Sequence, residues 1–274
     1  MILGVDIGGT KIKYALFSSD LSVIESGEVN SDAKQGANKL LENLFNLLDK
    51  FKFDGLGVST AGIVGKNGEI VYANDNIPNY TGVKLKEILS NRYGVPVAVL
   101  NDIDASAICE YHYSKCDDFY FIALGTGVGG AFVRKGNIIK GNGCFAGQIG
   151  YLDALDCDTV DNVVSTRGLE NISGLSGKEI FEMVKFGDTV ARQNLLKWVK
   201  ELAKVIKNAV GFFSPSKIVL GGAICSQGEF LLDFIKKECD NFPVPYKDSF
   251  TLSTATMENL SGALGSVIYL KNGE

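Results

Sequence analysis

The first fourteen residues, MILGVDIGGTKIKY, constrain the fold more than any other stretch of the chain. An apolar run ends at the carboxylate Asp6, two glycines and Thr10 follow, and apolar alternation resumes after Lys11. This order predicts a strand, a tight turn and a second strand. Because Gly8 and Gly9 leave backbone N–H groups uncovered, the turn is suited to binding a phosphate. An ordinary Gly-Gly hairpin turn is the alternative.

The composition limits the classes of function. The chain has 274 residues, of which 46% are hydrophobic and 22% charged, as in a globular protein long enough for two domains. Its net charge of −5 disfavours nucleic acid as a partner. The sequence contains no apolar run of about eighteen residues and no basic segment before the first strand, so we expect no membrane span and no signal peptide. These features predict a cytoplasmic protein.

The cysteine and histidine content argues against zinc and against a Ser-His-Asp hydrolase. The six cysteines form no C-x-x-C pair, and His112 is the single histidine. Structural zinc sites need such ligands at close spacing, and a hydrolase triad needs a partnered histidine. We therefore expect no structural zinc and ordinary thiols. The cysteines are Cys109, Cys116, Cys144, Cys157, Cys225 and Cys239.

Hydrophobic periodicity predicts an α/β chain in which the opening plan occurs twice. In the first half it predicts strands at 2–6, 11–17, 23–28, 55–60 and 95–100, a hairpin over 64–72, and helices at 37–51 and 85–93. In the second half it predicts strands at 119–124, 131–134, 137–139, 217–220 and 250–253, and helices at 105–113, 178–186, 190–213, 230–239 and 261–270. Each half opens on strand, Gly-rich turn, strand, turn, strand, which indicates an internal duplication.

Residues 125–130, GTGVGG, formally match the dinucleotide-binding pattern G-x-G-x-x-G. That fold requires a helix after the glycines. Here residues 131–134 alternate as a strand, so the pattern favours a second phosphate-binding turn between two strands. A Gly-rich hairpin without a ligand is the alternative.

Two further strand ends carry groups that suit a ligand. Asn101 and Asp102 follow the strand at 95–100, where α/β sheets place functional side chains, and a carboxylate there can accept a proton from a hydroxyl. Either residue could instead cap the next helix, and Asp102 could act while its neighbour caps. Gly221 and Gly222 end the strand at 217–220 and allow close approach of a ligand, or form a simple turn.

Taken together, seven motifs resemble the ROK sugar kinases of the hexokinase–Hsp70–actin superfamily. This resemblance implies two RNase-H-like α/β domains around a central cleft. The N-terminal lobe would comprise residues 1–101 plus about 258–274, and the C-terminal lobe residues 102–257. The motifs are DIGGTKIKY (6–14), GVSTAGIV (57–64), NIPNY (76–80), ND (101–102), GTGVGG (125–130), FAGQIGY (145–151) and VLGGAI (219–224).

The resemblance also implies ATP, Mg²⁺ and a sugar as ligands, and assigns roles to the motif residues. Asp102 would be the general base, and Asp6 would hold Mg²⁺ through water. The phosphates would contact Gly8, Gly9, Thr10 and Lys11 from one side and Thr126 and Gly127 from the other. The adenosine would lie against Gly221 and Gly222, and the sugar against Asn101, Asp102 and Asn76.

The chain departs from the family in the second lobe. Gln148 stands where the resemblance implies a sugar-binding Glu, Asp161 matches a second such Glu, and Tyr151 replaces a zinc-binding His. These departures resemble the zinc-free N-acetylmannosamine kinases, so we expect phosphorylation of the 6-hydroxyl of that sugar by a homodimer. A glucokinase or other hexose or glycoside kinase is one alternative. A degenerate protein that binds sugar without turnover is the other.

Overall fold

The computed structural model describes residues 1–154, 158–257 and 259–273 and divides the chain into two compact units. The first unit comprises residues 1–115, 140–145 and 259–273. The second comprises residues 116–139 and 146–257. Cys157 and residues 258 and 274 lie outside the described residues. No helix in the described ranges is long and apolar enough to cross a lipid bilayer.

The first unit is built on a five-stranded sheet whose order is β3-β2-β1-β4-β7. The three strands predicted at 2–6, 11–17 and 23–28 are confirmed and pair as an antiparallel meander, while β1, β4 and β7 run parallel to one another. Asp6 pairs with Ser59 in register, and Thr60 pairs with Asn101. The carboxyl ends of the three parallel strands therefore meet at one edge. The strands are β1 (Ile2–Ile7), β2 (Lys11–Phe17), β3 (Val23–Asn30), β4 (Gly55–Thr60) and β7 (Val97–Asn101).

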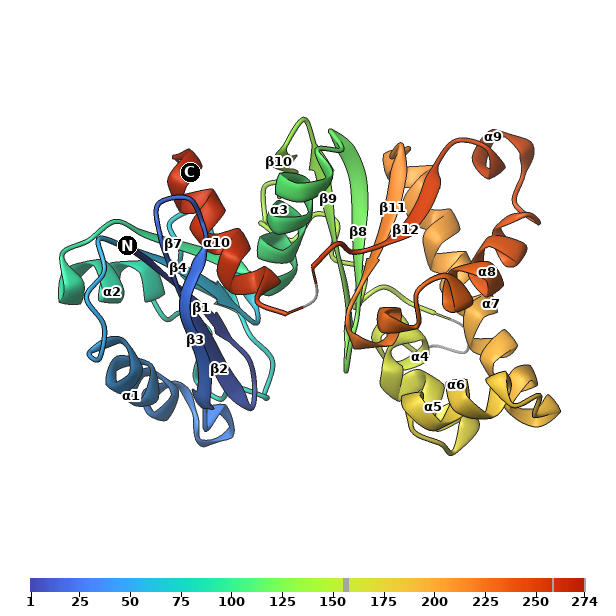
Figure 1. The fold of residues 1–274 in the computed structure, drawn as a ribbon, viewed down its shortest axis with the longest axis horizontal. Helices are drawn as coiled ribbons and strands as arrows, with labels where there is room; N and C mark the ends of the chain where they lie inside the picture. Colours follow the sequence, from blue (N-terminus) through green and yellow to red (C-terminus); the bar gives the residue numbers. More distant parts are fainter. Residues whose placement is uncertain (155–157, 258, 274) are drawn as a thin grey trace. The chain divides into compact units, whose positions relative to one another are not determined.

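Helices cover both faces of this sheet (Figure 1). α1 (Ala37–Leu48) and α2 (Leu85–Tyr93) lie on one side, and α3 (Asp102–Ser114) and α10 (Ser261–Asn272) on the other. A 3-10 turn, η1 (Ala33–Gln35), precedes α1, and β5 (Ile63–Val64) and β6 (Ile70–Tyr72) form the predicted hairpin.

Glycines let α10 approach the sheet and α3 closely. A Cβ at Gly4 would lie 2.6 Å from the carbonyl oxygen of Ala263, and one at Gly57 would lie 2.6 Å from the amide of Val267. A Cβ at Gly265 would lie 1.8 Å from the carbonyl oxygen of α3 residue Ala105. No side chain fits at these distances, so the glycines set how tightly the helix packs.

The second unit repeats the plan of the first. Its sheet has the order β10-β9-β8-β11-β12, again with two antiparallel pairs followed by two parallel ones. The predicted duplication is confirmed at the level of topology. A strand, β9, follows the Gly-rich turn directly, whereas a dinucleotide-binding fold would have a helix there. The strands are β8 (Asp118–Leu124), β9 (Val128–Arg134), β10 (Asn137–Ile138), β11 (Lys217–Gly221) and β12 (Thr251–Thr254).

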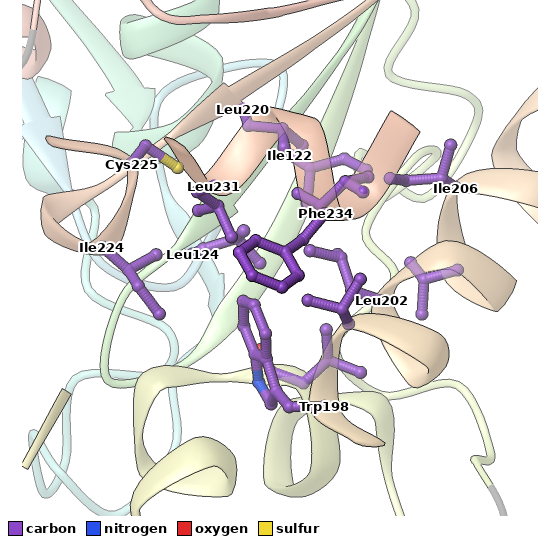
Figure 2. Packing of buried hydrophobic residues seen from close by; sticks show 14 of the residues in the cluster. Ile122, Leu124, Trp198, Leu202, Ile206, Leu220, Ile224, Cys225, Leu231 and Phe234 are labelled. Atoms are coloured by element: carbon purple, nitrogen blue, oxygen red, sulfur yellow. The ribbon is translucent and has the colours of Figure 1, made fainter. Parts of the chain in front are cut away.

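The long helix α7 (Thr189–Phe213) supplies much of the core of this unit (Figure 2). Its Trp198 is fully buried, and the indole Nε1 donates to the carbonyl oxygens of Val164 (3.0 Å) and Ser165 (3.2 Å). Trp198 thereby fixes the junction between α4 and α5. The other helices are α4 (Val160–Val164), α5 (Thr166–Ser173), α6 (Gly177–Lys185), the 3-10 turn η3 (Ala223–Gln227), α8 (Glu229–Cys239) and α9 (Val244–Lys247).

The division into units differs from the predicted boundary after residue 101. α3 belongs to the first unit because it packs along α10 and β7. Residues 140–145 also belong to the first unit, where Lys140 Nζ lies 3.4 Å from Asp104 Oδ2. The boundary implied by the resemblance lies at a strand end, whereas packing places it at the end of the following helix.

Candidate functional site

In the first unit, the edge formed by β1, β4 and β7 brings together Asp6, Ser59 and Asn101. Ser59 Oγ donates to Asp6 Oδ1 at 2.6 Å. Gly262, in the first turn of α10, borders the same pair. A Cβ there would lie 2.7 Å from Ser59 Oγ and 2.8 Å from Asp6 Oδ1. The absence of a side chain at this position is what leaves room for the carboxylate.

The environment of Asp6 disfavours its charge. Burial raises the pKa of Asp6, and the hydrogen bond from Ser59 and the positive charge of Lys13 oppose that rise. Lys13 is the direct cross-strand partner of Asp6 on β2. The sequence analysis missed Ser59 and Lys13. The signals that could have found them are a polar residue ending the neighbouring strand and a lysine at the position opposite Asp6 in the hairpin.

Asn101 caps α3. Its Oδ1 accepts from the amides of Ile103 (3.0 Å) and Asp104 (3.3 Å), and its Nδ2 donates to the Gly62 carbonyl (2.8 Å) and to Asp102 Oδ1 (2.9 Å). Capping by the neighbour is the arrangement that the sequence analysis allowed for. Asp102 is thus held at the start of α3 by Asn101 and by the Ile103 amide (3.0 Å), with a carboxylate that remains available for other chemistry.

Burial, assisted by the charges of Asp6 and Asp104, raises the pKa of Asp102 to about 7. A base of that strength is well matched to proton abstraction near neutral pH. Burial also raises the pKa of Asp104, and Lys140 opposes this rise. Three carboxylates therefore lie in one region of the first unit, and Lys140 is paired with Asp104.

The predicted phosphate-binding turn of the first unit is a tight hairpin between β1 and β2. The Gly8 amide donates to the Lys11 carbonyl at 2.9 Å, while Gly9 and Thr10 are exposed. Lys11 Nζ lies 3.3 Å from Glu28 Oε1 on β3. Both side chains of this pair are about half exposed, so it contributes little to stability and leaves the lysine able to exchange partners.

Asn76 lies on an exposed loop of the first unit. The backbone amide of Asn76 donates to Asn74 Oδ1 at 3.2 Å. The buried side chains of Ile77 and Tyr80 anchor the loop, and the Tyr80 hydroxyl lies 3.0 Å from Thr60 Oγ1. This contact ties the loop to Thr60, the residue that follows Ser59 at the end of β4.

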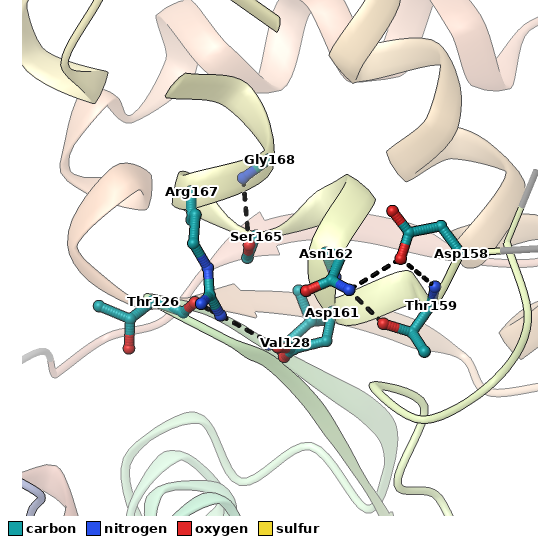
Figure 3. A network of polar contacts seen from close by, with 9 residues as sticks. All are labelled: Thr126, Val128, Asp158, Thr159, Asp161, Asn162, Ser165, Arg167 and Gly168. Atoms are coloured by element: carbon teal, nitrogen blue, oxygen red, sulfur yellow. Dashed lines mark hydrogen bonds and ion pairs between the residues drawn. The ribbon is translucent and has the colours of Figure 1, made fainter. Parts of the chain in front are cut away.

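In the second unit, the turn between β8 and β9 is held by residues 161–167, which belong to α4 and the start of α5 (Figure 3). The Thr166 amide donates to the Gly125 carbonyl (2.9 Å), and Arg167 Nη2 donates to the Thr126 carbonyl (3.2 Å). The Val128 amide donates to Asp161 Oδ1 (2.5 Å). Three backbone groups of one turn are therefore bound by residues 161–167.

The carboxylate of Asp161 lies against this turn. A Cβ at Gly127 would lie 2.6 Å from Asp161 Oδ1, so glycine is required there. Arg167 Nη2 lies 3.4 Å from Asp161 Oδ2 and pairs with it. Sequence reasoning missed Arg167. No local pattern reveals it, because its contact with Thr126 spans 41 positions of the chain.

Gly221 and Gly222 end β11 next to the same turn. Gly222 has a φ of 101°, and a Cβ on it would lie 2.1 Å from the Leu124 carbonyl, immediately before Gly125. Both Gly-rich turns of the second unit are therefore adjacent. Gln148 is half-buried in the loop after Gly147, whose carbonyl accepts from the Tyr120 hydroxyl.

The structure thus gathers some of the predicted residues into one group per unit, and it does not bring Asn76 or Gln148 into either group. Asp6, Asn101 and Asp102 lie together in the first, and Thr126, Gly127, Asp161, Gly221 and Gly222 lie together in the second. Within the described ranges, no group of three or more His, Cys, Asp or Glu side chains is arranged to hold a metal ion. The expectation of no structural zinc stays a prediction.

A family model, described as ROK family, matches residues 2–272. The chain belongs to the ROK family. This ROK protein is 27% identical over 315 residues to a glucokinase of Halalkalibacterium halodurans, covering 99% of this chain and 95% of that one. It is 26% identical over 293 residues to a beta-glucoside kinase of Listeria monocytogenes (100% and 98% covered). It is also 26% identical over 284 residues to an N-acetylmannosamine kinase of Salmonella heidelberg (97% of each).

The fold of this ROK protein is that of solved family members. It superposes on a ROK family glucokinase from Streptomyces griseus, in complex with glucose and AMPPNP, with a TM-score of 0.84 at 22% identity, covering 99% of both chains. The predicted two-domain α/β fold and the family resemblance are confirmed. The named relatives carry three different sugar specificities at nearly equal identity, so they do not rank one sugar above another.

Proposed function

We propose that this ROK protein is an ATP-dependent kinase that phosphorylates the 6-hydroxyl of a hexose-type sugar. The observation that carries the proposal is Asp102: a carboxylate with its pKa raised to about 7, held by Asn101 at the end of a parallel strand, beside Asp6. A phosphoryl-transfer enzyme needs little more from the protein than positioning, charge neutralisation and a base for the hydroxyl proton.

Asp102 accepts the proton of the sugar hydroxyl as that oxygen attacks the γ-phosphate. Asn101 orients Asp102 through the bond from its Nδ2, and we assign Asn101, Asn76 and Gln148 to the sugar. The carboxylate of Asp6 suits a hydrated Mg²⁺, because hard cations prefer oxygen ligands. Burial raises the pKa of both Asp6 and Asp102, and the charge of Asp6 adds to the rise at Asp102, so a divalent cation beside them would stabilise the ionised carboxylates.

The two Gly-rich turns are the candidates for the nucleotide phosphates. The turn of the first unit offers Gly8, Gly9 and Thr10 with the ammonium of Lys11. The turn of the second offers the amides of Thr126 and Gly127. Backbone amides of such turns bind anions, and Mg-ATP supplies the phosphoryl group that is transferred. Gly221 and Gly222, which carry no side chains, leave space for the nucleoside.

N-acetylmannosamine is the first candidate for the sugar. Gln148 keeps an acceptor oxygen and adds N–H donors where the resemblance implies a Glu, and together with Tyr151 this pattern resembles the zinc-free kinases of that sugar. Glucose and beta-glucosides are the alternatives, since relatives named for them are equally similar. A protein that binds sugar without turnover is the remaining one.

A coupled assay of ADP release tests the proposal. The purified protein is given ATP and Mg²⁺ with N-acetylmannosamine, N-acetylglucosamine, mannose, glucose or a beta-glucoside, and Asp102→Asn is the control for contaminating kinases. We expect sugar-dependent ADP release that the variant lacks, strongest with N-acetylmannosamine. Turnover of glucose alone contradicts the choice of sugar, and no turnover with any sugar contradicts the kinase proposal. Light scattering of the same sample tests the predicted homodimer.

A further inference from the structure

The turn at 125–128 is held in place by residues 161–167 of α4 and α5, two helices that the sequence patterns did not predict. Thr166 and Arg167 bind the carbonyl groups of Gly125 and Thr126, and Asp161 binds the amide of Val128. Within the part of the chain that the structure describes, the amides of Thr126 and Gly127 donate to no acceptor. Residues 161–167 therefore bind three backbone groups of the turn and leave the amides of Thr126 and Gly127 to bind a phosphate.

This segment is itself firmly anchored. Trp198, the single tryptophan of the chain, donates to the carbonyls of Val164 and Ser165 from the buried core. Ser165 Oγ accepts from the Gly168 amide and caps α5. The position of Arg167 is thus set by the core of the unit and not by the exposed turn alone.

The charges are arranged to suit an anion. The turn sequence GTGVGG contains no cation, and the carboxylate of Asp161 lies beside Gly127. An uncompensated carboxylate there would repel a phosphate. Arg167 pairs with Asp161 at 3.4 Å, and its side chain is 57% exposed. Its planar guanidinium has enough donors to bind the Thr126 carbonyl and Asp161 and still face solvent.

We propose that Asp161 and Arg167 are positioning residues for the nucleotide: they fix the 125–128 turn with the Thr126 and Gly127 amides free, and Arg167 cancels the charge of Asp161. This inference rests on the proposed kinase function. It separates the role of Asp161 from that of a sugar ligand, because both carboxylate oxygens are directed at the turn and at Arg167.

The chain provides a matched control at the other end of the same hairpin. Arg134 Nε lies 3.9 Å from Asp118 Oδ2, and the two side chains are 61% and 32% exposed, against 57% and 33% for Arg167 and Asp161. Arg134→Met therefore removes an equally exposed arginine of the same unit from an equivalent pair, without touching the turn.

The experiment measures the affinity of wild type, Arg167→Met, Asp161→Asn and Arg134→Met for a non-hydrolysable ATP analogue with Mg²⁺ by calorimetry, together with kcat and both KM values. We expect Arg167→Met to weaken analogue binding and raise the KM for ATP about tenfold or more, the usual loss for a hydrogen bond to a charged group. The KM for sugar should change less than twofold. Asp161→Asn keeps an acceptor for Val128 and should show a smaller loss, and Arg134→Met none.

Trp198 fluorescence and thermal unfolding of each variant establish that the 161–167 segment remains folded, and Arg167→Gln, which removes the charge but keeps an N–H donor, replaces Arg167→Met if that variant unfolds. Unchanged analogue affinity in the Arg167 variant overturns the inference, as does a rise confined to the KM for sugar. If wild type itself binds no ATP analogue, the kinase proposal fails and this inference with it. If wild type binds the analogue and the Arg167 and Asp161 variants bind it with the same affinity, this inference fails while the kinase proposal stands.

Discussion

Replacing Asp102 by Asn tests two consequences of a single electrostatic fact. The folded chain holds the pKa of Asp102 at about 7 through burial and the neighbouring charges of Asp6 and Asp104, whereas the ordinary value is 3.8. Ionised Asp102 is therefore useful as a base and costly to the fold. Asn has nearly the same shape, and its side-chain oxygen can still accept from Asn101 Nδ2 and the Ile103 amide, but it carries no charge.

The sign of the pH dependence follows from proton release. Between pH 3.8 and 7 the unfolded chain has lost this proton and the folded chain retains it, so stability falls as pH rises. Each unit in this window costs about 1.4 kcal/mol. The full cost above pH 7 is at most about 4 kcal/mol, a ceiling because solvent screens a partly exposed group.

The measurement is the free energy of unfolding in urea for wild type and Asp102→Asn at pH 5 and pH 8, without nucleotide or Mg²⁺. We expect the stabilising effect of Asn to be larger at pH 8 than at pH 5 by about 2 kcal/mol. The same substitution should lower kcat by roughly 10²- to 10⁴-fold. An equal difference at both pH values refutes the raised pKa, and near wild-type turnover removes Asp102 from its role as base.

Three further substitutions test the packing and the charges around this residue. Gly265→Ala should destabilise the protein by about 1–3 kcal/mol, seen as a lower urea midpoint, because the new methyl group meets a carbonyl of α3. Lys140→Met leaves Asp104 without its cation, so the loss of stability, measured in urea, should become smaller as pH falls and protonation relieves the unpaired charge. Asn101→Ala should cost about 1 kcal/mol in cap energy and also lower kcat, because Asp102 loses the bond that orients it.

Local sequence patterns were sufficient to locate the candidate site residues that lie at strand ends. The alternation before Asp6 and the apolar run before Asn101 fixed where each strand stops, and parallel neighbours then bring those stops to one edge. The duplication could also be predicted from the sequence, because a Gly-rich turn between two strands occurs at the equivalent place in each half of the chain. The two sheets have the same order and the same directions.

What the patterns missed depends on long-range packing. α4 and α5 have five and eight residues, too short for a helical period to appear, and their capping residues Thr159 and Ser165 are unremarkable in sequence. The role of Arg167 requires knowing that this segment returns to the turn at 125–128. The placement of α3 in the first unit likewise depends on α10, whose Gly265 meets α3 from the far end of the chain.

The packing of α10 has a consequence for how the protein is made. Gly4 and Gly57 form a surface on the first sheet against which α10 packs closely. A ribosome delivers residues 259–273 after the entire second unit has emerged, so this surface stays uncovered during most of translation. The second unit can complete its core while the first waits. Chains that stop before α10 should therefore hold a finished second unit beside an open first sheet, the form that chaperones and proteases would meet.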